Sequence, residues 1–256
     1  MYKPTSRRIL ITGAANGIGA GLARLFAADG HELIITDLDG DAAAEVAKQI
    51  ASAGGRARSV RLEITSSSDI ASAVDAAGAI DVLVNNAGLQ HVARLEDFPA
   101  DRWHFLISVL LSGAADMMRA VLPGMRQRGF GRIVNIGSIH GLVASPFKSA
   151  YVAAKHGLIG LSKSVALENA DLDITVNTIC PAYVRTQLVD RQIAAQARAH
   201  GLSEEQVVNE VLLAPMPKKA FVTVEEIHDL AAYLISAAAR NVTAQAIAID
   251  GGWTAR

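Results

Sequence analysis

Short apolar segments alternate with longer amphipathic segments along the chain of 256 residues. The short segments are rich in β-branched and aliphatic residues and predict strands at 9–12, 32–36, 57–62, 82–84, 132–136, 174–179 and 246–249. Between them, apolar positions at helical spacing predict helices that include 18–28, 42–53, 150–168 and 224–236. Apolar strands that alternate with helices are typical of a parallel sheet covered on both faces. The pattern predicts an α/β fold with a doubly wound parallel sheet of about seven strands, whose ligands bind at the carboxyl ends of the strands.

One long connection interrupts this rhythm. Residues 183–222 join the sixth and seventh predicted strands and number about 40, far more than the usual roughly 2–6 residues of such a connection. Two parts of this segment, 187–198 and 204–213, have helical patterns, so we expect a small helical lid over the site. The sequence has no linker, repeat or low-complexity tract, and we expect a single domain over residues 1–256.

The composition is that of an ordinary soluble globular protein, with 51% hydrophobic and 19% charged residues. A formal net charge of -1 gives no basic field for nucleic acid or an anionic membrane, so we expect neither as a partner. No apolar run reaches the roughly 18 residues that span a bilayer, and residues 1–8 lack the apolar stretch of a signal peptide. Cys180 is the only cysteine and follows an apolar run, so we expect a packed thiol in a cytoplasmic protein.

A glycine-rich turn, Thr12–Gly19, follows the first predicted strand and opens the first predicted helix. Glycines here allow a tight turn and a close approach of the backbone to a pyrophosphate, and the helix start offers unpaired N–H donors. The spacing is Gly-x-x-x-Gly-x-Gly rather than the commoner Gly-x-Gly-x-x-Gly, and an ordinary βα turn is the alternative interpretation. We expect dinucleotide contacts from Gly13, Asn16, Gly17, Ile18 and Gly19.

An acidic residue, Asp37, ends the second predicted strand, 18 residues after Gly19. An acid at this place hydrogen-bonds the hydroxyls of an adenosine ribose and repels a 2′-phosphate. No Arg or Lys in the turn or just after Asp37 would neutralise such a phosphate, so NAD is favoured over NADP. The alternative is a turn residue at a strand end. The run Asn85, Asn86, Ala87 and Gly88 closes the fourth strand, and we expect it to form the floor of the cofactor site, although it could also be a polar turn.

Three further residues predict the chemistry. Ser138 follows the fifth predicted strand, Tyr151 comes 13 residues later, and Lys155 lies one helical turn beyond it on the same face. A neighbouring ammonium favours a phenolate, so we expect Lys155 to lower the pKa of Tyr151 from its usual value of roughly 10. Tyr151 would then exchange a proton with a substrate hydroxyl while a hydride moves to or from the nicotinamide, and Ser138 would hold the substrate oxygen.

A Tyr-x-x-x-Lys pair alone is common on helices, where it is usually a solvated pair. Combined in this order with the glycine-rich turn, the acid at the second strand and the upstream serine, it indicates a nicotinamide-dependent alcohol/ketone oxidoreductase.

On these motifs the chain resembles the short-chain dehydrogenase/reductase family, from the first strand to the terminal Asp250-Gly251-Gly252. The resemblance implies a Rossmann-type fold and a homotetramer, less often a dimer, in which helices 100–121 and 150–168 pack between subunits. It also adds cofactor contacts from Glu63, Ile64, Tyr151, Lys155, Pro181 and Val184.

Within this family, the segments 89–93, 138–145, 148–157 and 250–253 resemble the bacterial D-3-hydroxybutyrate dehydrogenases. That likeness implies oxidation of (R)-3-hydroxybutyrate to acetoacetate. It assigns the substrate carboxylate and pocket to Gln90, Ser138, His140, Lys148, Tyr151, Tyr183, Gln192 and Trp253.

The physical chemistry of the substrate supports part of this assignment independently. Lys148 and His140 flank the catalytic residues, and a small hydroxy acid needs cationic and amide donors to replace the water around its carboxylate. Each residue also has a structural alternative. Lys148 could be a solvent-facing charge, His140 a loop histidine bonded to the backbone, Gln192 an exposed helix residue, and Trp253 an anchor in a core or an interface.

Four positions depart from the family pattern. Leu110 stands where the family places an asparagine that distorts its helix and holds a water behind the active-site lysine. Ser108, Ser112 or a backbone carbonyl could replace that contact, or proton exchange could be impaired. Ala182 replaces a glycine and Glu63 an aspartate, and Tyr183 stands where the hydroxybutyrate dehydrogenases tend to carry a tryptophan. These departures leave two other hypotheses open: a dehydrogenase of another small hydroxy or keto acid, and a cofactor-binding protein with low turnover.

Overall fold

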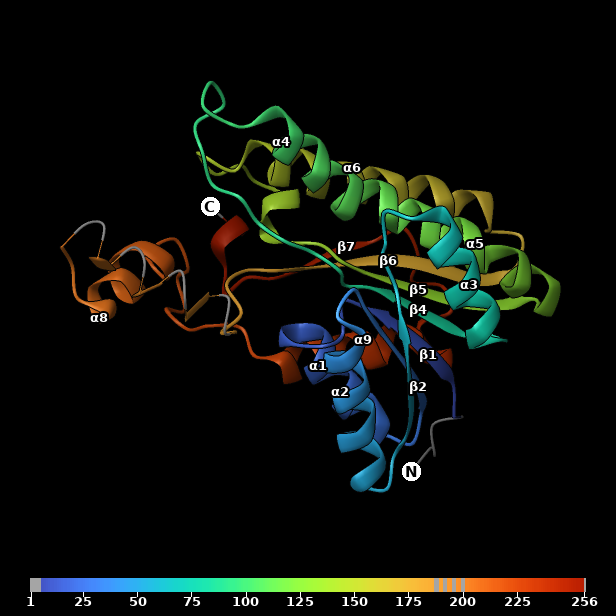
Figure 1. The fold of residues 1–256 in the computed structure, drawn as a ribbon. Helices are drawn as coiled ribbons and strands as arrows, with labels where there is room; N and C mark the ends of the chain where they lie inside the picture. Colours follow the sequence, from blue (N-terminus) through green and yellow to red (C-terminus); the bar gives the residue numbers. More distant parts are fainter. Residues whose placement is uncertain (1–5, 187–188, 191–192, 195–196, 199–200, 256) are drawn as a thin grey trace.

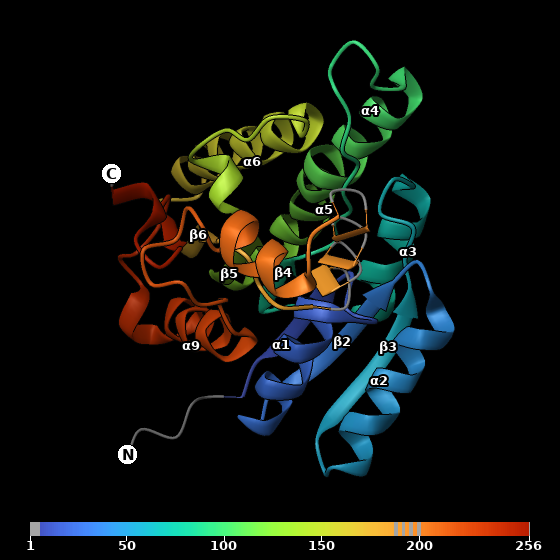
Figure 2. The ribbon, with the colours of Figure 1, turned by 90° about the vertical axis from the view of Figure 1, so that its left-hand side faces the viewer.

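The computed structural model describes residues 6–186, 189–190, 193–194, 197–198 and 201–255. Seven strands in this part of the chain form one parallel sheet in the order β3-β2-β1-β4-β5-β6-β7 (Figure 1, Figure 2). They are β1 (Arg8–Thr12), β2 (Glu32–Asp37), β3 (Arg56–Arg61), β4 (Val82–Asn85), β5 (Phe130–Ile136), β6 (Asp173–Pro181) and β7 (Ala246–Ile249). Because the order reverses between β1 and β4, loops diverge there and open a crevice at the carboxyl ends. The predicted doubly wound sheet is confirmed, and each strand bound lies within two residues of the prediction.

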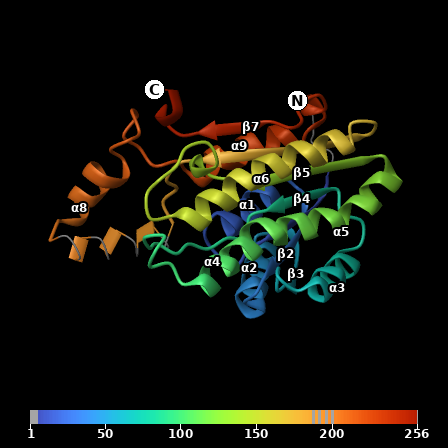
Figure 3. The ribbon, with the colours of Figure 1, turned by 90° about the horizontal axis from the view of Figure 1, so that it is seen from above.

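Helices cover both faces of the sheet, as the continuous apolar strands require. One face carries α1 (Gly17–Ala28), α2 (Gly40–Ser52) and α9 (Val224–Ile235), and the other carries α3 (Ser67–Ala77), α4 (Ala100–Ile107), α5 (Gly113–Arg128) and α6 (Ser149–Glu168) (Figure 1, Figure 3). Side chains alternate between the two cores along a strand. In β1, Ile9 and Ile11 join the core under α1, whereas Leu10 joins the core under α5.

The predicted lid segment begins where Val184 pairs with Val222 in an isolated parallel bridge. It contains the short helix α8 (Glu204–Gln206), which continues as a π-helical turn, Val207–Leu212. The helix predicted at 204–213 is thereby confirmed, whereas the one predicted at 187–198 lies partly outside the described residues. Figures 1 and 3 show that α8 projects beyond one edge of the sheet.

A long apolar helix runs through α4, a π-helical turn and α5, from Ala100 to Arg128. By length and hydropathy this helix of 29 residues could cross a membrane, although polar residues interrupt its apolar run. However, 44% of its most apolar window is buried inside the protein. Met117 and Met118 are buried in the core beneath the sheet. The helix therefore has the burial of a core helix in a soluble protein.

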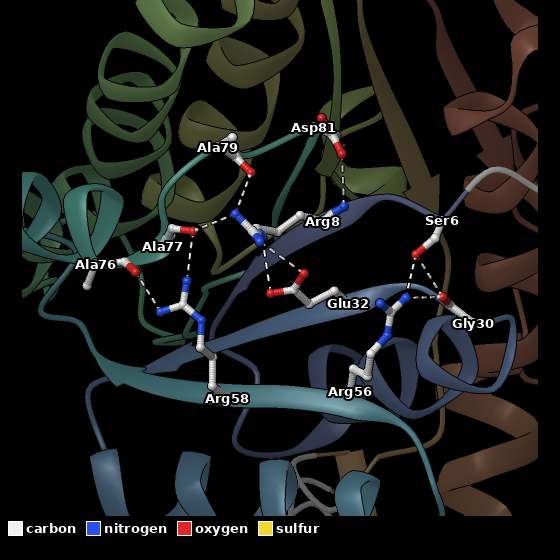
Figure 4. Close-up of polar contacts among 10 residues, drawn as sticks. All are labelled: Ser6, Arg8, Gly30, Glu32, Arg56, Arg58, Ala76, Ala77, Ala79 and Asp81. Carbon is white, nitrogen blue, oxygen red and sulfur yellow. Dashed lines mark hydrogen bonds and ion pairs between the residues drawn. The ribbon is translucent and has the colours of Figure 1, made fainter.

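The edge at the amino ends of β1, β2 and β3 is held together by arginines (Figure 4). The Nε of Arg8 lies 3.1 Å from a carboxylate oxygen of Glu32, which pairs the starts of β1 and β2. Arg58 donates to the carbonyl oxygens of Ala76 and Ala77, at 2.6 and 2.7 Å, at the end of α3. Cations stabilise a helix C-terminus, where carbonyl groups lack partners. These cations serve the fold, and the chemistry-bearing residues lie at the opposite edge.

Candidate active site

A cavity of about 580 Å³ opens at the carboxyl ends of the strands. Most of the predicted site residues line it. They are Gly13, Asn16, Gly17, Ile18, Asp37, Glu63, Ile64, Asn86, Ala87, Gly88, Gln90, Ser138, His140, Lys148, Tyr151, Lys155, Pro181, Tyr183 and Val184. Its size is typical of a pocket for a small molecule or cofactor. The structure therefore brings together residues that are spread over 172 positions of the sequence, from 13 to 184.

Two of the predicted site residues that the structure describes, Gly19 and Trp253, do not line the cavity. Gly19 lies beneath the turn, where a Cβ would collide with the carbonyl oxygen of Gly13, so this glycine allows α1 to pack closely against the turn. Trp253 stands behind the wall, with its ring stacked on Tyr183 at a centroid distance of 6.0 Å. Gln192 lies outside the described residues.

The glycine-rich turn is locked to the end of β4. Asn86 donates through Nδ2 to the carbonyl oxygens of Thr12 and Gly13, at 3.0 and 2.8 Å. The Thr12 hydroxyl accepts the backbone N–H groups of Asn86 and Ala87, both at 3.0 Å. Gly13 has a φ of 62°, and a Cβ there would lie 2.7 Å from the Cα of Ala87. Only glycine fits this approach, which leaves the backbone free to face the cavity.

The start of α1 offers a place for phosphate groups. Its N-cap residue, Asn16, is extended and makes no side-chain capping hydrogen bond. The first N–H groups of a helix have no partners inside the helix and carry its positive dipole end. Asn16, Gly17 and Ile18 all line the cavity. The residues present therefore fit the pyrophosphate of a dinucleotide.

The carboxylate of Asp37 is fixed beside this turn. Its Oδ2 accepts the backbone N–H of Ala15 at 3.0 Å, and its Oδ1 accepts that of Asp39 at 3.1 Å. Among the described lining residues, Lys148 and Lys155 are the only lysines or arginines, and both belong to the catalytic end of the cavity. At the end of the cavity formed by the glycine-rich turn, the fixed carboxylate of Asp37 therefore has no lysine or arginine beside it among the described lining residues. Nothing in this part of the lining would neutralise a phosphate on the adenosine ribose.

Glu63 points its carboxylate to its own turn, because its Oε1 accepts from both the N–H and the hydroxyl of Thr65, at 3.2 and 2.8 Å. The carboxylate is engaged locally, although the residue lines the cavity.

The three residues predicted to carry the chemistry meet in the cavity. Ser138 follows β5, and its hydroxyl accepts the N–H of His140 at 3.1 Å. Tyr151 and Lys155 lie on successive turns of α6, with the Lys155 ammonium 5.6 Å from the centre of the Tyr151 ring. Lys155 is only 5% exposed, and its Nζ donates to the carbonyl oxygen of Ile136 at 2.7 Å. This backbone partner was not predicted, because a carbonyl leaves no signal in the sequence.

Burial sets the pKa values of Tyr151 and Lys155. It raises the pKa of Tyr151, and the hydrogen bond with Ser138 lowers it only in part. Burial also lowers the pKa of Lys155 to about 8. The prediction that Lys155 lowers the pKa of Tyr151 is wrong for the chain by itself: the loss of hydration of the phenolate outweighs the hydrogen bond with Ser138, and the nearby Cys180 and Tyr183 raise this pKa further. Cys180, next to this trio, is fully buried with its pKa raised to about 11, as expected of a packed thiol.

A second polar corner lies beside the trio. The Nζ of Lys148 lies 3.5 Å from Nε2 of His140 and donates to the hydroxyl of Tyr183 at 3.4 Å. Burial, helped by the Lys148 ammonium, lowers the pKa of His140 to about 4, so this buried imidazole is neutral near pH 7. The Oε1 of Gln90 accepts the N–H of His91, which leaves its amide –NH₂ as a donor. The corner, formed by Gln90, His140, Lys148 and Tyr183, thus holds one cation and several neutral polar groups.

Asn85 belongs to the core rather than to the cofactor floor. Its Nδ2 donates to Asn135 at 2.8 Å, and Asn135 donates to the hydroxyl of Ser162, also at 2.8 Å. Thr178 joins the same buried network. The network ties β4, β5, β6 and α6 together beneath the site. In the described residues no group of three or more His, Cys, Asp or Glu side chains could hold a metal ion.

Leu110 closes the side of the cavity against α6. It is 2% exposed and packs with Phe98, Leu106, Ala150 and Ala154. The helix distortion expected of an asparagine is present without one, because residues Ser108–Ser112 form a π-helical turn.

Neither serine at the ends of this turn replaces the missing asparagine. Ser108 donates its hydroxyl to the carbonyl oxygen of Phe105 at 2.8 Å, Ser112 is exposed, and neither lines the cavity. Two of the alternatives are left: a backbone carbonyl, such as that of Ile136, which accepts from Lys155, or an impaired proton exchange.

Leu110→Asn is expected to raise kcat severalfold and to lower the melting temperature. The amide would add a polar group to the wall of the cavity that Lys155 also lines, while its burial among apolar side chains costs stability. Steady-state rates and thermal unfolding measure both effects. An unchanged kcat would mean that proton exchange already proceeds through another group at full rate.

Comparison with known proteins identifies the class. The sequence pattern of the short chain dehydrogenase family matches residues 7–197, and the chain belongs to this family. It is therefore an oxidoreductase of a family that uses NAD(P).

Among its relatives, the D-beta-hydroxybutyrate dehydrogenase of Rhizobium meliloti (strain 1021) is 46% identical over 257 residues, which cover 98% of this chain and 100% of that relative. The enzyme of the same name from Cupriavidus necator is 45% identical, with 96% and 97% covered. An uncharacterized oxidoreductase of Bacillus subtilis (strain 168) is 43% identical, with 96% and 98% covered.

Proposed function

We propose that the protein oxidises (R)-3-hydroxybutyrate to acetoacetate with NAD. One observation carries this proposal: the Ser138–Tyr151–Lys155 trio and the cationic corner around Lys148 share one cavity with the glycine-rich turn. A trio that handles a hydroxyl and a cation that handles a carboxylate, side by side, suit a small hydroxy acid. The two hydroxybutyrate dehydrogenases among the relatives support the same substrate.

Bound NAD would supply a nicotinamide ring that accepts a hydride. Gly13, Asn16, Gly17 and Ile18 would hold its pyrophosphate, with Gly19 behind them. Asp37 would bind the hydroxyls of the adenosine ribose, and its fixed carboxylate would repel the extra phosphate of NADP.

The remaining contacts would come from the two sides of the crevice. Glu63 and Ile64 would lie beside the adenine, Asn86, Ala87 and Gly88 would form the floor, and Pro181 and Val184 would flank the nicotinamide, with Lys155 at its ribose.

Tyr151 would move the proton. Its phenolate would accept the proton of the substrate hydroxyl while the hydride leaves the carbon that carries this hydroxyl. The Ser138 hydroxyl would stabilise the changing charge on the substrate oxygen. Because burial raises the pKa of Tyr151, the phenol holds its proton near neutral pH. The protonated form donates the proton in reduction of the ketone. The rate of oxidation should therefore increase as pH rises toward that pKa, and the rate of reduction should increase as pH falls below it.

The substrate carboxylate would lie in the second corner. The Lys148 ammonium supplies the charge, and Gln90 and neutral His140 supply hydrogen bonds. Tyr183 and Trp253 form the stacked wall behind them. Gln192, outside the described residues, would add a further donor from the lid.

We also propose that residues 1–256 form a single domain in which 183–222 act as a lid. An apolar cluster that includes Ile193, Val207 and Leu212 packs against Tyr183, which joins this segment to the wall of the cavity. We further propose a cytoplasmic homotetramer, with the exposed sides of residues 100–121, which run from α4 into α5, and of α6 between subunits. The single, buried cysteine and the buried share of the long helix support a soluble protein.

A second candidate is a dehydrogenase of another small hydroxy or keto acid. The hydroxyl of Tyr183, which accepts a hydrogen bond from Lys148, favours this second candidate. This hydroxyl adds a polar atom to the pocket wall, whereas a purely apolar wall would suit a simple alkyl chain.

A panel of hydroxy acids and neutral secondary alcohols, assayed with NAD and NADP, tests both candidates. The proposal predicts the highest kcat/KM for (R)-3-hydroxybutyrate with NAD. A higher value for a bulkier or more polar acid would favour the second candidate, and cofactor binding without turnover would favour a low-turnover binding protein.

A further inference from the structure

Phe147, next to the cationic corner, has a backbone conformation that its side chain disfavours. Its φ is 66°. Among the described residues, the non-glycine residues with a positive φ are Phe147, Lys219 and Ala244. For a bulky residue the left-handed region is a true outlier, since its Cβ crowds the backbone. Such outliers persist where surrounding structure holds them, and they concentrate at functional sites.

The aromatic ring does not account for this conformation. It is 47% exposed, and the Arg94 guanidinium above it lies 5.6 Å from the ring centre. Arg94 is itself well exposed and lies 3.7 Å from the carboxylate of Glu96. Contacts of this kind at a surface contribute little. The well-defined contact is made by the backbone instead: the Phe147 carbonyl oxygen accepts the N–H of Ala93 at 2.9 Å.

The backbone conformation of Phe147 sets the direction in which the side chain of the next residue, Lys148, leaves the backbone. Lys148 follows at φ −126° and ψ 33°, immediately before α6, and no side chain caps that helix. From there its Nζ reaches Nε2 of His140 at 3.5 Å and the hydroxyl of Tyr183 at 3.4 Å. The hydrogen bond from Ala93 also ties the segment that carries Gln90 to the segment that carries Lys148. One strained residue thus joins the two segments that supply donors to the corner.

We propose that Phe147 is a positioning residue for substrate binding: its left-handed backbone aims the Lys148 ammonium, together with the Gln90 segment, at the carboxylate of the substrate. This inference rests on the proposed function for the identity of the substrate. The required property is the conformation of the backbone and not the aromatic ring. Substitutions can separate the two.

A matched set of variants makes the separation. Phe147→Asn removes the ring but suits the left-handed region, and Phe147→Gly adopts it without strain. Phe147→Val keeps an apolar side chain, but its β-branch opposes this conformation. A role for the ring predicts that Val is the mildest change, whereas a role for the backbone predicts that it is the most severe.

Two readouts are measured: KM for (R)-3-hydroxybutyrate and the dissociation constant of butyrate from the enzyme–NADH complex. Butyrate has the carboxylate but no hydroxyl, so it reports on the corner without turnover. We expect Phe147→Val to raise both constants by about five- to tenfold, which corresponds to the energy of backbone strain at one residue. The Asn and Gly variants should stay within about twofold of the unmodified chain. The KM for NAD and the kcat at saturation should stay unchanged, since neither depends on the aim of Lys148.

Three outcomes would overturn the inference: equal weakening in all variants, weakening that is smallest for Phe147→Val, or no change in any of them. If (R)-3-hydroxybutyrate is not turned over but butyrate affinity falls only in Phe147→Val, the proposed substrate fails and the role of Phe147 stands. If butyrate does not bind the unmodified chain, the role of Phe147 fails with it.

Discussion

Tyr151→Phe is expected to lower kcat for (R)-3-hydroxybutyrate by roughly 10²–10⁴-fold, the usual contribution of a positioned proton donor or acceptor. The substitution removes one oxygen, the atom that would exchange a proton with the substrate and that hydrogen-bonds Ser138. The aromatic ring remains packed beside Leu110 and the other residues of its apolar cluster. NADH affinity and the melting temperature should therefore change little.

Tyr233→Phe is the matched control. Tyr233 lies on α9, is 46% exposed and does not line the cavity, so the same loss of a hydroxyl should leave kcat unchanged. Initial rates, NADH fluorescence and thermal unfolding on both variants measure these effects. If Tyr151→Phe kept near-normal kcat, Tyr151 would not be the group that moves the proton.

Lys148→Ala is expected to raise KM for (R)-3-hydroxybutyrate by about 10- to 100-fold, the scale of a lost hydrogen bond to a charged group. Lys148 is the cation of its corner, and the neighbouring His140 is neutral near pH 7 and cannot replace the charge. Neutral secondary alcohols have no carboxylate, so their KM should change much less. The effect should fall mainly on KM, because the ammonium binds the carboxylate equally in the ground and transition states.

Lys48→Ala provides the control for this second substitution. Lys48 is an exposed lysine on α2, outside the residues that line the cavity, and its loss should leave KM unchanged for acids and alcohols alike. Steady-state kinetics on the two variants with both substrate classes gives the comparison. An equal rise in KM for acids and neutral alcohols in Lys148→Ala would remove this residue from carboxylate recognition.

The fold was predictable because the strands and helices differ in the period of their apolar positions. Continuous runs such as residues 9–12 identified strands buried on both faces, and polar residues after strand ends identified Asp37 and Ser138 at the ligand edge. The π-helical turn at Ser108–Ser112 could not be predicted from the local sequence. Leu110 is an ordinary helix residue, and the widened turn depends on how the long helix packs against α6.

The finer parts of the site depend on backbone groups and on burial, which leave no pattern in a sequence. The carbonyl of Ile136 that binds Lys155 and the N–H of Ala15 that binds Asp37 are of this kind. The raised pKa of Tyr151 is another case, because it follows from the depth of the ring and not from the spacing to Lys155. The left-handed conformation of Phe147 is a third, since nothing in the residue type favours it.

The central claim is that one cavity transfers a hydride between a small hydroxy acid and NAD. Its most direct test is the initial rate of NADH formation by the unmodified chain with (R)-3-hydroxybutyrate, with its (S) form under the same conditions for comparison. We predict rapid formation of NADH with the (R) form and little with the (S) form, because the trio would hold the hydroxyl, the Lys148 corner would hold the carboxylate, and the C–H bond would have to face the nicotinamide as a third point, which only one enantiomer satisfies. Binding of NADH without turnover of either form or of any other small hydroxy acid would contradict it.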